Sequence, residues 1–393
     1  MSEVARALLL KLLSQADRGG RETIPISEHS ASDYFSVTDL SGRDSIHSYL
    51  ENAEKSNAIL LERGRGAESQ DLKRIRLLDA DKLAEWLDVP RACAYAELIE
   101  KELTPLLEDA NDWLQEAFGY AMSYWTLGKM AFRISFEDTD AAVNLFKVAL
   151  SVSNNEHRDL DMRTYSVRVL NDSKAIEGML NKLALLLRRN PEWKQFDNNN
   201  ELFRMLGLEK FPPPIYIKGP LFIKYCNEDW DISTLRPFVG LSPDMVRDIK
   251  LTRNVPYVLT VENLASFQRH VREIDDDSIV IFSGGFPSPA LTHILKLIDQ
   301  CVPDGNRYLH WGDRDVGGIR IFSHIESNIS RHTLIPHLMN EGAFVESVFN
   351  KNEIKHLTVY SEKESSAGNM AKYWLENKLG PIEQESQDPI SPQ

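Results

Sequence analysis

The sequence predicts a mixed α/β protein, mainly α-helical in its first half and built on a parallel sheet in its last third. Apolar residues recur at helical spacing over most of residues 1–160. From residue 254 onward, short β-branched runs alternate with amphipathic segments, which is typical of a parallel sheet with right-handed crossovers. The length of 393 residues allows about two to three domains, each large enough to bury its own core.

Composition and charge narrow the class of protein. The hydrophobic fraction of 42% and the charged fraction of 26% are ordinary for a globular protein. No apolar run approaches the roughly 20 residues needed to span a bilayer, and the N-terminus lacks the features of a signal peptide, so we expect a cytoplasmic protein without membrane association. The widely spaced Cys93, Cys226 and Cys301 are expected to be reduced thiols. The net charge of -14 argues against a general nucleic-acid coat protein, although local basic patches could override it.

Residues 1–90 have the element order of a winged helix. A helical pattern over residues 4–13 is followed by a short strand at 22–27, two helices at 27–36 and 41–57, and two alternating strands around a glycine-containing turn at 58–79. Lysine and arginine on such a wing can neutralise phosphates, and such a helix can enter a major groove. The candidate DNA-binding residues are Arg43, Arg63, Arg65, Lys73, Arg74 and Arg76. Interspersed glutamates leave open the alternative that this domain binds protein.

The middle of the chain carries fewer functional signals. Residues 91–160 read as a helical connector whose tryptophans are packing residues. Residues 161–245 are expected to form a middle α+β domain, CAP-like, with a strand at 164–170 and a small sheet or hairpin at 215–225. A helix between them is expected to end at Arg188 and Arg189, beside Pro191.

Three acidic residues follow strands of the C-terminal sheet, which is expected to occupy residues 250–385 ahead of a disordered tail at 386–393. Glu262 ends the first strand, and Asp313 and Asp315 end the third. Ligands of open parallel sheets bind at the carboxyl ends of the strands. Mg²⁺ prefers carboxylate oxygens, and Gly317 and Gly318 allow close approach, so the sequence predicts a metal site at this edge.

The same residues carry a family resemblance. "VEN" at 261–263, "FSGGF" at 282–286 and "WGDRDVGG" at 311–318 resemble a Toprim domain, the metal-binding module of topoisomerases, primases and related nucleases. More narrowly, "HWGDRDVGGIRI", "MRTYSVRVLNDSKAIE" and "WLENKLGPIEQES" resemble the JetD (MksG) family of nuclease subunits of Wadjet plasmid-defence systems. That family is similar to the A subunit of topoisomerase VI.

The resemblance implies a site and partners. It places Glu262 at the Toprim glutamate and Asp313 and Asp315 at the aspartate pair, with Mg²⁺ or Mn²⁺ as cofactor. Glu383 and Glu385 are candidate ligands of a second metal, although "NKLGP" interrupts the helix that should present them. The implied partners are DNA, with a circular plasmid as target, a second copy of the chain in a homodimer, and a condensin-like SMC complex, JetABC.

Two mechanisms and one non-enzymatic alternative remain open at this stage. A metal-activated water would hydrolyse the phosphodiester, with Glu262 as ligand or as general base. A topoisomerase-like enzyme would instead attack with a tyrosine, for which Tyr165 and Tyr216 are the candidates. A degenerate domain that only binds DNA or protein is the third alternative, and the presence of all three expected acids counts against it.

Overall fold

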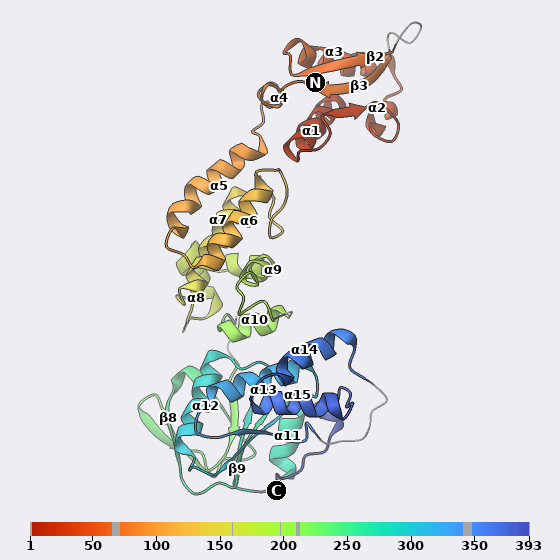
Figure 1. Cartoon of the computed structure of the whole chain (residues 1–393). Helices are drawn as coiled ribbons and strands as arrows, with labels where there is room; N and C mark the ends of the chain where they lie inside the picture. Colours follow the sequence, from red (N-terminus) through yellow and green to blue (C-terminus); the bar gives the residue numbers. More distant parts are fainter. Residues whose placement is uncertain are drawn as a thin grey trace. The chain divides into compact units, whose positions relative to one another are not determined.

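The computed structural model in Figure 1 describes residues 2–64, 71–158, 160–196, 198–209, 213–340 and 348–392. The chain divides into two compact units, which we describe separately: residues 1–156 with 166–195, and residues 157–165 with 196–393. Helices and several sheets are both present, so the predicted mixed α/β class is confirmed. Among the described residues, no helix combines the length and apolarity that a membrane span requires.

The first unit begins with helices around a three-stranded sheet. Strand β3 is central in the order β1-β3-β2, and both of its pairings are antiparallel. Alternate strand residues such as Ile24, Leu61 and Ile75 face a core that also receives Leu9 and Leu50 from the helices. The elements are α1 (Glu3–Asp17), β1 (Thr23–Pro25), α2 (Ser32–Ser36), α3 (Leu40–Lys55), β2 (Ile59–Arg63), β3 (Leu72–Leu77) and α4 (Ala80–Leu87).

The rest of the first unit is helical. Its elements are α5 (Ala92–Leu107), α6 (Asp112–Trp125), α7 (Thr139–Ser153) and α9 (Ala175–Leu187). Trp125 and Phe146 are fully buried, and their rings meet edge to face at 6.2 Å. Trp125 is therefore a packing residue, as predicted.

Helix α8 (Met162–Leu170) corrects the predicted strand at residues 164–170. The alternation of Thr164, Ser166 and Arg168 with apolar residues imitates a strand. However, Asp161 accepts hydrogen bonds from the backbone N–H groups of Arg163 and Thr164 (3.0 Å each), which is how an acidic residue caps a helix. This local capping outweighs the strand-like pattern.

A six-stranded sheet forms the centre of the second unit. Its order is β12-β11-β9-β10-β4-β7, with parallel pairing from β12 to β10 and antiparallel pairing at β4 and β7. The strands are β4 (Ile215–Lys218), β7 (Val239–Leu241), β9 (Tyr257–Val261), β10 (Ile279–Phe282), β11 (Arg307–Trp311) and β12 (Leu334–Pro336). The predicted parallel strands are therefore present, and two strands that precede residue 245 join the same sheet.

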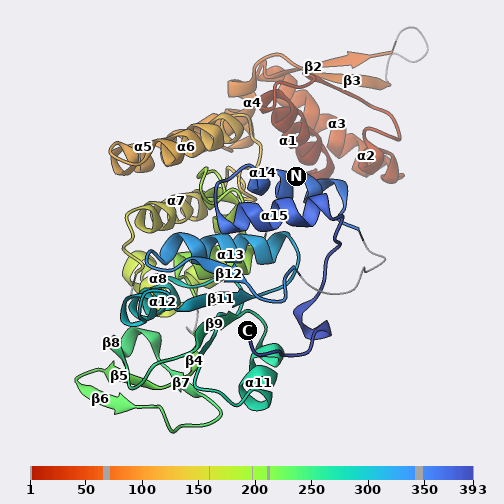
Figure 2. The same cartoon turned by 60° about the horizontal axis from the view of Figure 1, so that its bottom comes forward.

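Helices cover both faces of this sheet (Figure 2). Leu259 and Trp311 pack with Phe267 of α11 on one face, whereas His310, next to Trp311 along β11, contacts the ring of Phe322 of α13 on the other. The helices of the unit are α10 (Asn199–Leu206), α11 (Leu264–Glu273), α12 (Pro289–Cys301), α13 (Val316–Asn328), α14 (Lys351–Ser361) and α15 (Ser366–Glu376), with short 3-10 turns η2 (Pro243–Met245) and η3 (Gln384–Ser386).

The strands predicted to pair at residues 215–225 lie in two different sheets. β4 pairs with β10 and β7, whereas β5 (Leu221–Tyr225) pairs with β6 (Glu228–Asp231) and β8 (Val246–Leu251) in a separate antiparallel sheet. Gly219 separates β4 from β5 with a φ of 155°, and its backbone packs against Ile279 of β10. The chain therefore leaves one sheet and enters the other instead of forming a hairpin.

The segment after residue 385 is held against the sheet, contrary to the predicted disordered tail. Trp311 Nε1 donates to Gln387 Oε1 (3.0 Å), and Gln387 Nε2 donates to the Leu338 carbonyl (2.9 Å). Arg269 forms an ion pair with Asp388 (2.8 Å). The polar side chains whose composition predicts disorder, those of Gln387 and Asp388, form these hydrogen bonds and this ion pair instead.

Candidate metal centre

The acidic residues lie where strand order reverses in the parallel sheet. From β9 the chain crosses to β10 on one side, and it later continues through β11 and β12 on the other. The carboxyl ends of the neighbouring strands β9 and β11 therefore form the edge at which sheets of this type bind ligands. The backbone N–H of Glu262 donates to the Trp311 carbonyl (2.9 Å), which holds the two strand ends together at this point.

Glu262 is largely enclosed and surrounded by other acids. Its Oε2 accepts a long hydrogen bond of 3.4 Å from the backbone N–H of Asp313. Burial, together with the negative charges of Asp313 and Asp315, raises the pKa of Glu262 to about 8. Glu201 of α10 contributes to the same repulsion, which identifies an acidic neighbour that the sequence did not indicate.

Asp313 and Asp315 have different structural roles. Asp315 is the N-cap of α13, and its Oδ1 accepts from the backbone N–H of Gly318 (2.6 Å). Asp313 Oδ1 accepts from the backbone N–H of Gln384 (2.7 Å). Burial raises the pKa of Asp313 to about 6; the Gln384 hydrogen bond opposes this effect, and the neighbouring carboxylates reinforce it.

Two glycines allow these carboxylates to approach. A Cβ at Gly318 would lie 2.0 Å from the carbonyl oxygen of Asp313, a backbone atom that cannot move away. A Cβ at Gly312 would lie 2.6 Å from Glu262 Oε2 and 2.8 Å from His310 Nε2. The glycines that the sequence assigned to close approach were Gly317 and Gly318, and the tightest contact is at Gly318.

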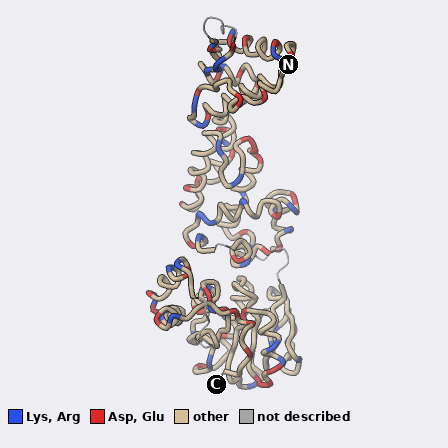
Figure 3. Tube along the Cα trace, turned by 90° about the vertical axis from the view of Figure 1, so that its right-hand side faces the viewer, with Lys and Arg blue, Asp and Glu red and all other residues tan. Residues whose placement is uncertain are grey.

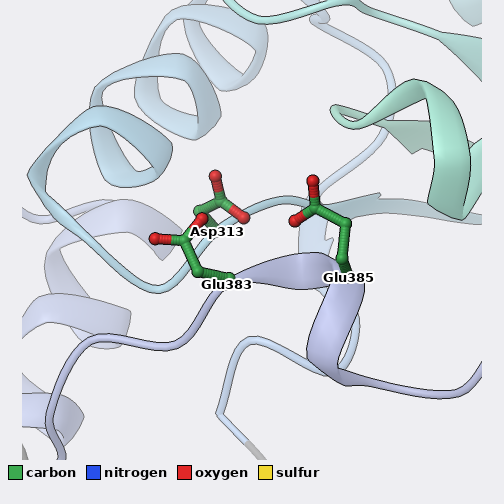
Figure 4. A group of neighbouring side chains, drawn as sticks. All are labelled: Asp313, Glu383 and Glu385. Carbon is green, nitrogen blue, oxygen red and sulfur yellow. The ribbon is translucent and has the colours of Figure 1, made fainter.

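The C-terminal segment completes the cluster (Figure 4). Asp313, Glu383 and Glu385 each offer a carboxylate oxygen, and these oxygens lie within 4.8 Å of one another. Glu383 and Glu385 come from η3 and the residue before it, a position that does not require the interrupted helix considered in the sequence. Glu262 and Asp315 are not members of this three-residue group, but both act electrostatically on the same centre.

The donor set fits a hard divalent cation. All of the candidate ligands are carboxylates, and among the described residues none of the five forms an ion pair with lysine or arginine. Beside Glu262, His310 Nε2 is fully buried and, within the described part of the chain, has no hydrogen-bond partner. Crowded carboxylates, of which Glu262 and Asp313 have a raised pKa, lie next to an unsatisfied buried nitrogen and have no cationic partner among the described residues.

The two candidate tyrosine nucleophiles are packing residues in this structure. Tyr165 is 1% exposed and contacts the ring of His157 at 5.9 Å. Tyr216 is partly buried and packs between Phe238 (5.2 Å) and Phe282 (5.9 Å), against the core of the sheet.

Four of the candidate DNA-binding residues of the N-terminal unit pair with acids. Arg63 pairs with Glu51 (2.7 Å), Lys73 with Asp71 (3.6 Å), and both Arg74 (3.4 Å) and Arg76 (2.5 Å) with Glu62; these ion pairs are exposed or half-exposed. Arg43 lies 5.0 Å above the ring of Tyr34 and donates to the Val37 carbonyl. Arg65 lies outside the described residues. Basic and acidic residues are interspersed in this unit (Figure 3).

Comparison with known proteins identifies the second unit more closely. Residues 243–386 match the sequence profile of the family described as Wadjet protein JetD, C-terminal. The chain is also similar to the Wadjet protein JetD of Bacillus cereus strain Q1, with 24% identity over 252 residues. That alignment spans 63% of this chain and 60% of the relative, so it covers less than two thirds of the relative's length. The resemblance to JetD that the sequence predicts is confirmed.

Proposed function

We propose, from the similarity to JetD and the carboxylates at the strand ends, that this chain is a metal-dependent DNA endonuclease of a Wadjet-type defence system. In this proposal residues 250–385 act as a Toprim domain and the first 90 residues as a winged helix. The observation that carries the proposal is the meeting of Glu262, Asp313, Glu383 and Glu385 at one sheet edge, inside the region that matches the JetD family.

Asp313, Glu383 and Glu385 are the proposed ligands of a Mg²⁺ or Mn²⁺ ion, with Glu262 and Asp315 completing the acidic site. A bound divalent ion would lower the pKa of a water nucleophile and stabilise the charge that develops on the phosphoryl group. The chain's own part is to hold these oxygens together against their repulsion. Asp315 also fixes the start of α13, and this fixes the turn that carries Asp313.

Glu262 must release a proton before it can act as ligand or as general base. Its raised pKa means that the carboxyl group is largely protonated at neutral pH in the metal-free chain. A nearby cation would favour the ionised form, so proton release from Glu262 would accompany metal binding. The two roles of Glu262 remain alternatives within the proposal.

Hydrolysis is favoured over tyrosine transesterification. A nucleophilic tyrosine has to reach the DNA phosphorus, and the burial of Tyr165 and the aromatic packing of Tyr216 both oppose this. Protein-free DNA ends are therefore the expected product. Any DNA fragment that remains covalently attached to the denatured chain, and is lost in Tyr165→Phe or Tyr216→Phe, contradicts hydrolysis.

The proposed partners are circular DNA, a second copy of the chain and a condensin-like SMC complex. Phosphate contacts position a protein without reading sequence, and the net charge of -14 disfavours unassisted DNA binding at physiological salt. We therefore propose that a homodimer of low intrinsic activity is delivered to DNA by the partner assembly.

The test is cleavage of supercoiled plasmid by the purified chain with Mg²⁺ or Mn²⁺, with and without the partner complex and ATP. Metal-dependent nicking or linearisation that the complex stimulates supports the proposal. Absence of cleavage in every combination contradicts nuclease activity and favours a binding module. Rapid digestion of any DNA by the chain alone contradicts delivery by a partner.

A further inference from the structure

Gln384 is a buried amide between two exposed glutamates. Its side chain is 0% exposed, whereas Glu383 and Glu385 on either side project toward Asp313 (Figure 4). Burying an amide is unfavourable unless its polar atoms are hydrogen-bonded. The partners of this side chain therefore indicate why it is placed there.

The amide connects β9 and β11, the two strands whose ends meet at this edge. Its Oε1 accepts from the backbone N–H of Asn263, which follows β9 (2.8 Å), and its Nε2 donates to the Trp311 carbonyl at the end of β11 (3.2 Å). A carboxamide can accept at one strand and donate at the other, which an ionised carboxylate cannot do. The two partners also fix which atom is oxygen and which is nitrogen.

The backbone of the same residue contacts a candidate ligand directly. The Gln384 N–H donates to Asp313 Oδ1 (2.7 Å), and Asn263 Nδ2 donates to Glu385. Because Glu383 and Glu385 are its chain neighbours, fixing Gln384 fixes the points from which their side chains extend. Gln384 therefore fixes the positions of three carboxylates relative to the strands of the sheet.

Gln384 is not the only tether of this segment. Arg314 and Ile382 exchange backbone hydrogen bonds (2.9 and 3.2 Å), and Arg314 Nε donates to the Gly380 carbonyl (2.7 Å). Gln387 makes its own bonds to Trp311 and Leu338. Loss of the Gln384 side chain should therefore leave the segment attached but its carboxylates less well placed.

We propose that Gln384 is a positioning residue that assembles Asp313, Glu383 and Glu385 into a metal site before a metal ion binds. The inference rests on the proposed function, because it assumes that these carboxylates bind a divalent ion. Residues that orient metal ligands typically change metal affinity about 10–100-fold when they are replaced.

The experiment measures Mn²⁺ binding by calorimetry for the full chain and two matched variants. Gln384→Met keeps the approximate volume and removes both side-chain hydrogen bonds. Gln387→Met removes two hydrogen bonds from the same segment, one of them also to Trp311, without touching a candidate ligand. We expect about 10–100-fold weaker binding in Gln384→Met, a change within twofold in Gln387→Met, and similar melting temperatures in chelator.

If Mn²⁺ affinity falls equally in the two variants, or does not fall in Gln384→Met, the positioning role is overturned. Failure of the wild-type chain to bind Mn²⁺ overturns the proposed function itself, so the two failures are distinct.

Hydrogen exchange of the wild-type segment 382–386 decides the case even if Gln384→Met does not fold. The proposal predicts slow exchange of the Gln384 amide without metal. Exchange that becomes slow only after Mn²⁺ is added shows that the metal orders the segment, and it overturns the proposal.

Discussion

The N-terminal hairpin and the acidic edge of the C-terminal sheet differ in how their charged side chains are paired. On β2 and β3, Arg63, Arg74 and Arg76 each lie within ion-pair distance of Glu51 or Glu62. At the sheet edge, Glu262 and Asp313 are crowded by further carboxylates, and burial with repulsion raises the pKa of both. The described arginines of the hairpin have carboxylate partners, whereas among the described residues the carboxylates of the acidic edge have no lysine or arginine partner.

This difference indicates where function is concentrated. Exposed ion pairs contribute little to stability and reduce the charge available to a partner. Uncompensated buried carboxylates destabilise the fold at neutral pH, so they are expected at sites where a ligand offsets the repulsion. Four predictions test this contrast, from the largest expected effect to the smallest.

Replacing Asp313 should have the largest effect on activity. Asp313→Asn removes a member of the three-carboxylate group, so we expect loss of plasmid cleavage and of Mn²⁺ binding. Because the replaced carboxyl group has a raised pKa, the metal-free variant should melt at the same or a higher temperature at pH 8. The control is Asp388→Asn, an exposed residue of the C-terminal segment that pairs with Arg269. Full cleavage by Asp313→Asn would remove Asp313 from the site.

Gly318→Ala should damage both the fold and the site. The new Cβ would lie 2.0 Å from the Asp313 carbonyl oxygen, so the turn that carries Asp313 must shift. We expect a loss of about 1–3 kcal/mol in the free energy of unfolding, measured by denaturant titration, together with weaker Mn²⁺ binding. Gly178→Ala in α9 is the matched control, because nothing lies within 4 Å of its added Cβ. It should stabilise the protein by about 0.5–1 kcal/mol. Equal effects of the two substitutions would contradict the close approach at Gly318.

The metal-free protein should become less stable as pH rises. Folding raises the pKa of Glu262 from its usual 4.5 to about 8, so the folded state binds this proton more tightly than the unfolded chain. The resulting stabilisation is full below pH 4.5 and is lost as the pH rises through 8. Folding also raises the pKa of Asp313, from 3.8 to about 6, so its contribution to stability is lost as the pH rises through 6. Melting curves in chelator at several pH values measure this slope. Glu262→Gln should flatten it between pH 6 and 8, and an unchanged slope would contradict the raised pKa.

Changes at the hairpin should have the smallest effect. Charge reversal at Arg63, Arg65 and Arg74 together should weaken DNA binding for all sequences alike and lower the salt dependence by at most about 3 in log–log slope. Glu62→Gln sharpens the test, because it frees Arg74 and Arg76 and should strengthen binding. Fluorescence anisotropy with short duplexes at several salt concentrations measures both. Unchanged affinity in the triple variant would favour a protein-binding hairpin.

The sequence predicted those parts of the fold that local patterns specify. The alternation of apolar strands and amphipathic helices after residue 254 predicted β9 to β12 and the helices between them, and strand ends identified Glu262 and Asp313. The JetD resemblance, confirmed by comparison, contributed Glu383 and Glu385. Parallel pairing brings strand ends to one edge whatever their separation in the chain, so this inference needed no further information.

Features that depend on tertiary contacts were not predicted. Strand-like alternation at residues 164–170 gave way to a helix capped by Asp161, and the chain at Gly219 passes between two sheets. Glu201 of α10, whose sequence carries no motif, acts on Glu262 through its charge. The polar residues after 385 were expected to be disordered because composition does not reveal that Gln387 and Asp388 have partners on distant elements.

The buried contacts of Gln384 also have a consequence for the order in which the molecule forms. They join Gln384 to Asn263, which lies 121 positions earlier in the chain, and to Trp311, which lies 73 positions earlier. Contacts at such separations carry a high loop-closure entropy, so they are expected late on the folding pathway, after the strands have paired. A partly folded chain would then display a structured sheet edge without its full set of carboxylates. If the chain is the proposed nuclease, folding order alone would keep incompletely folded molecules inactive.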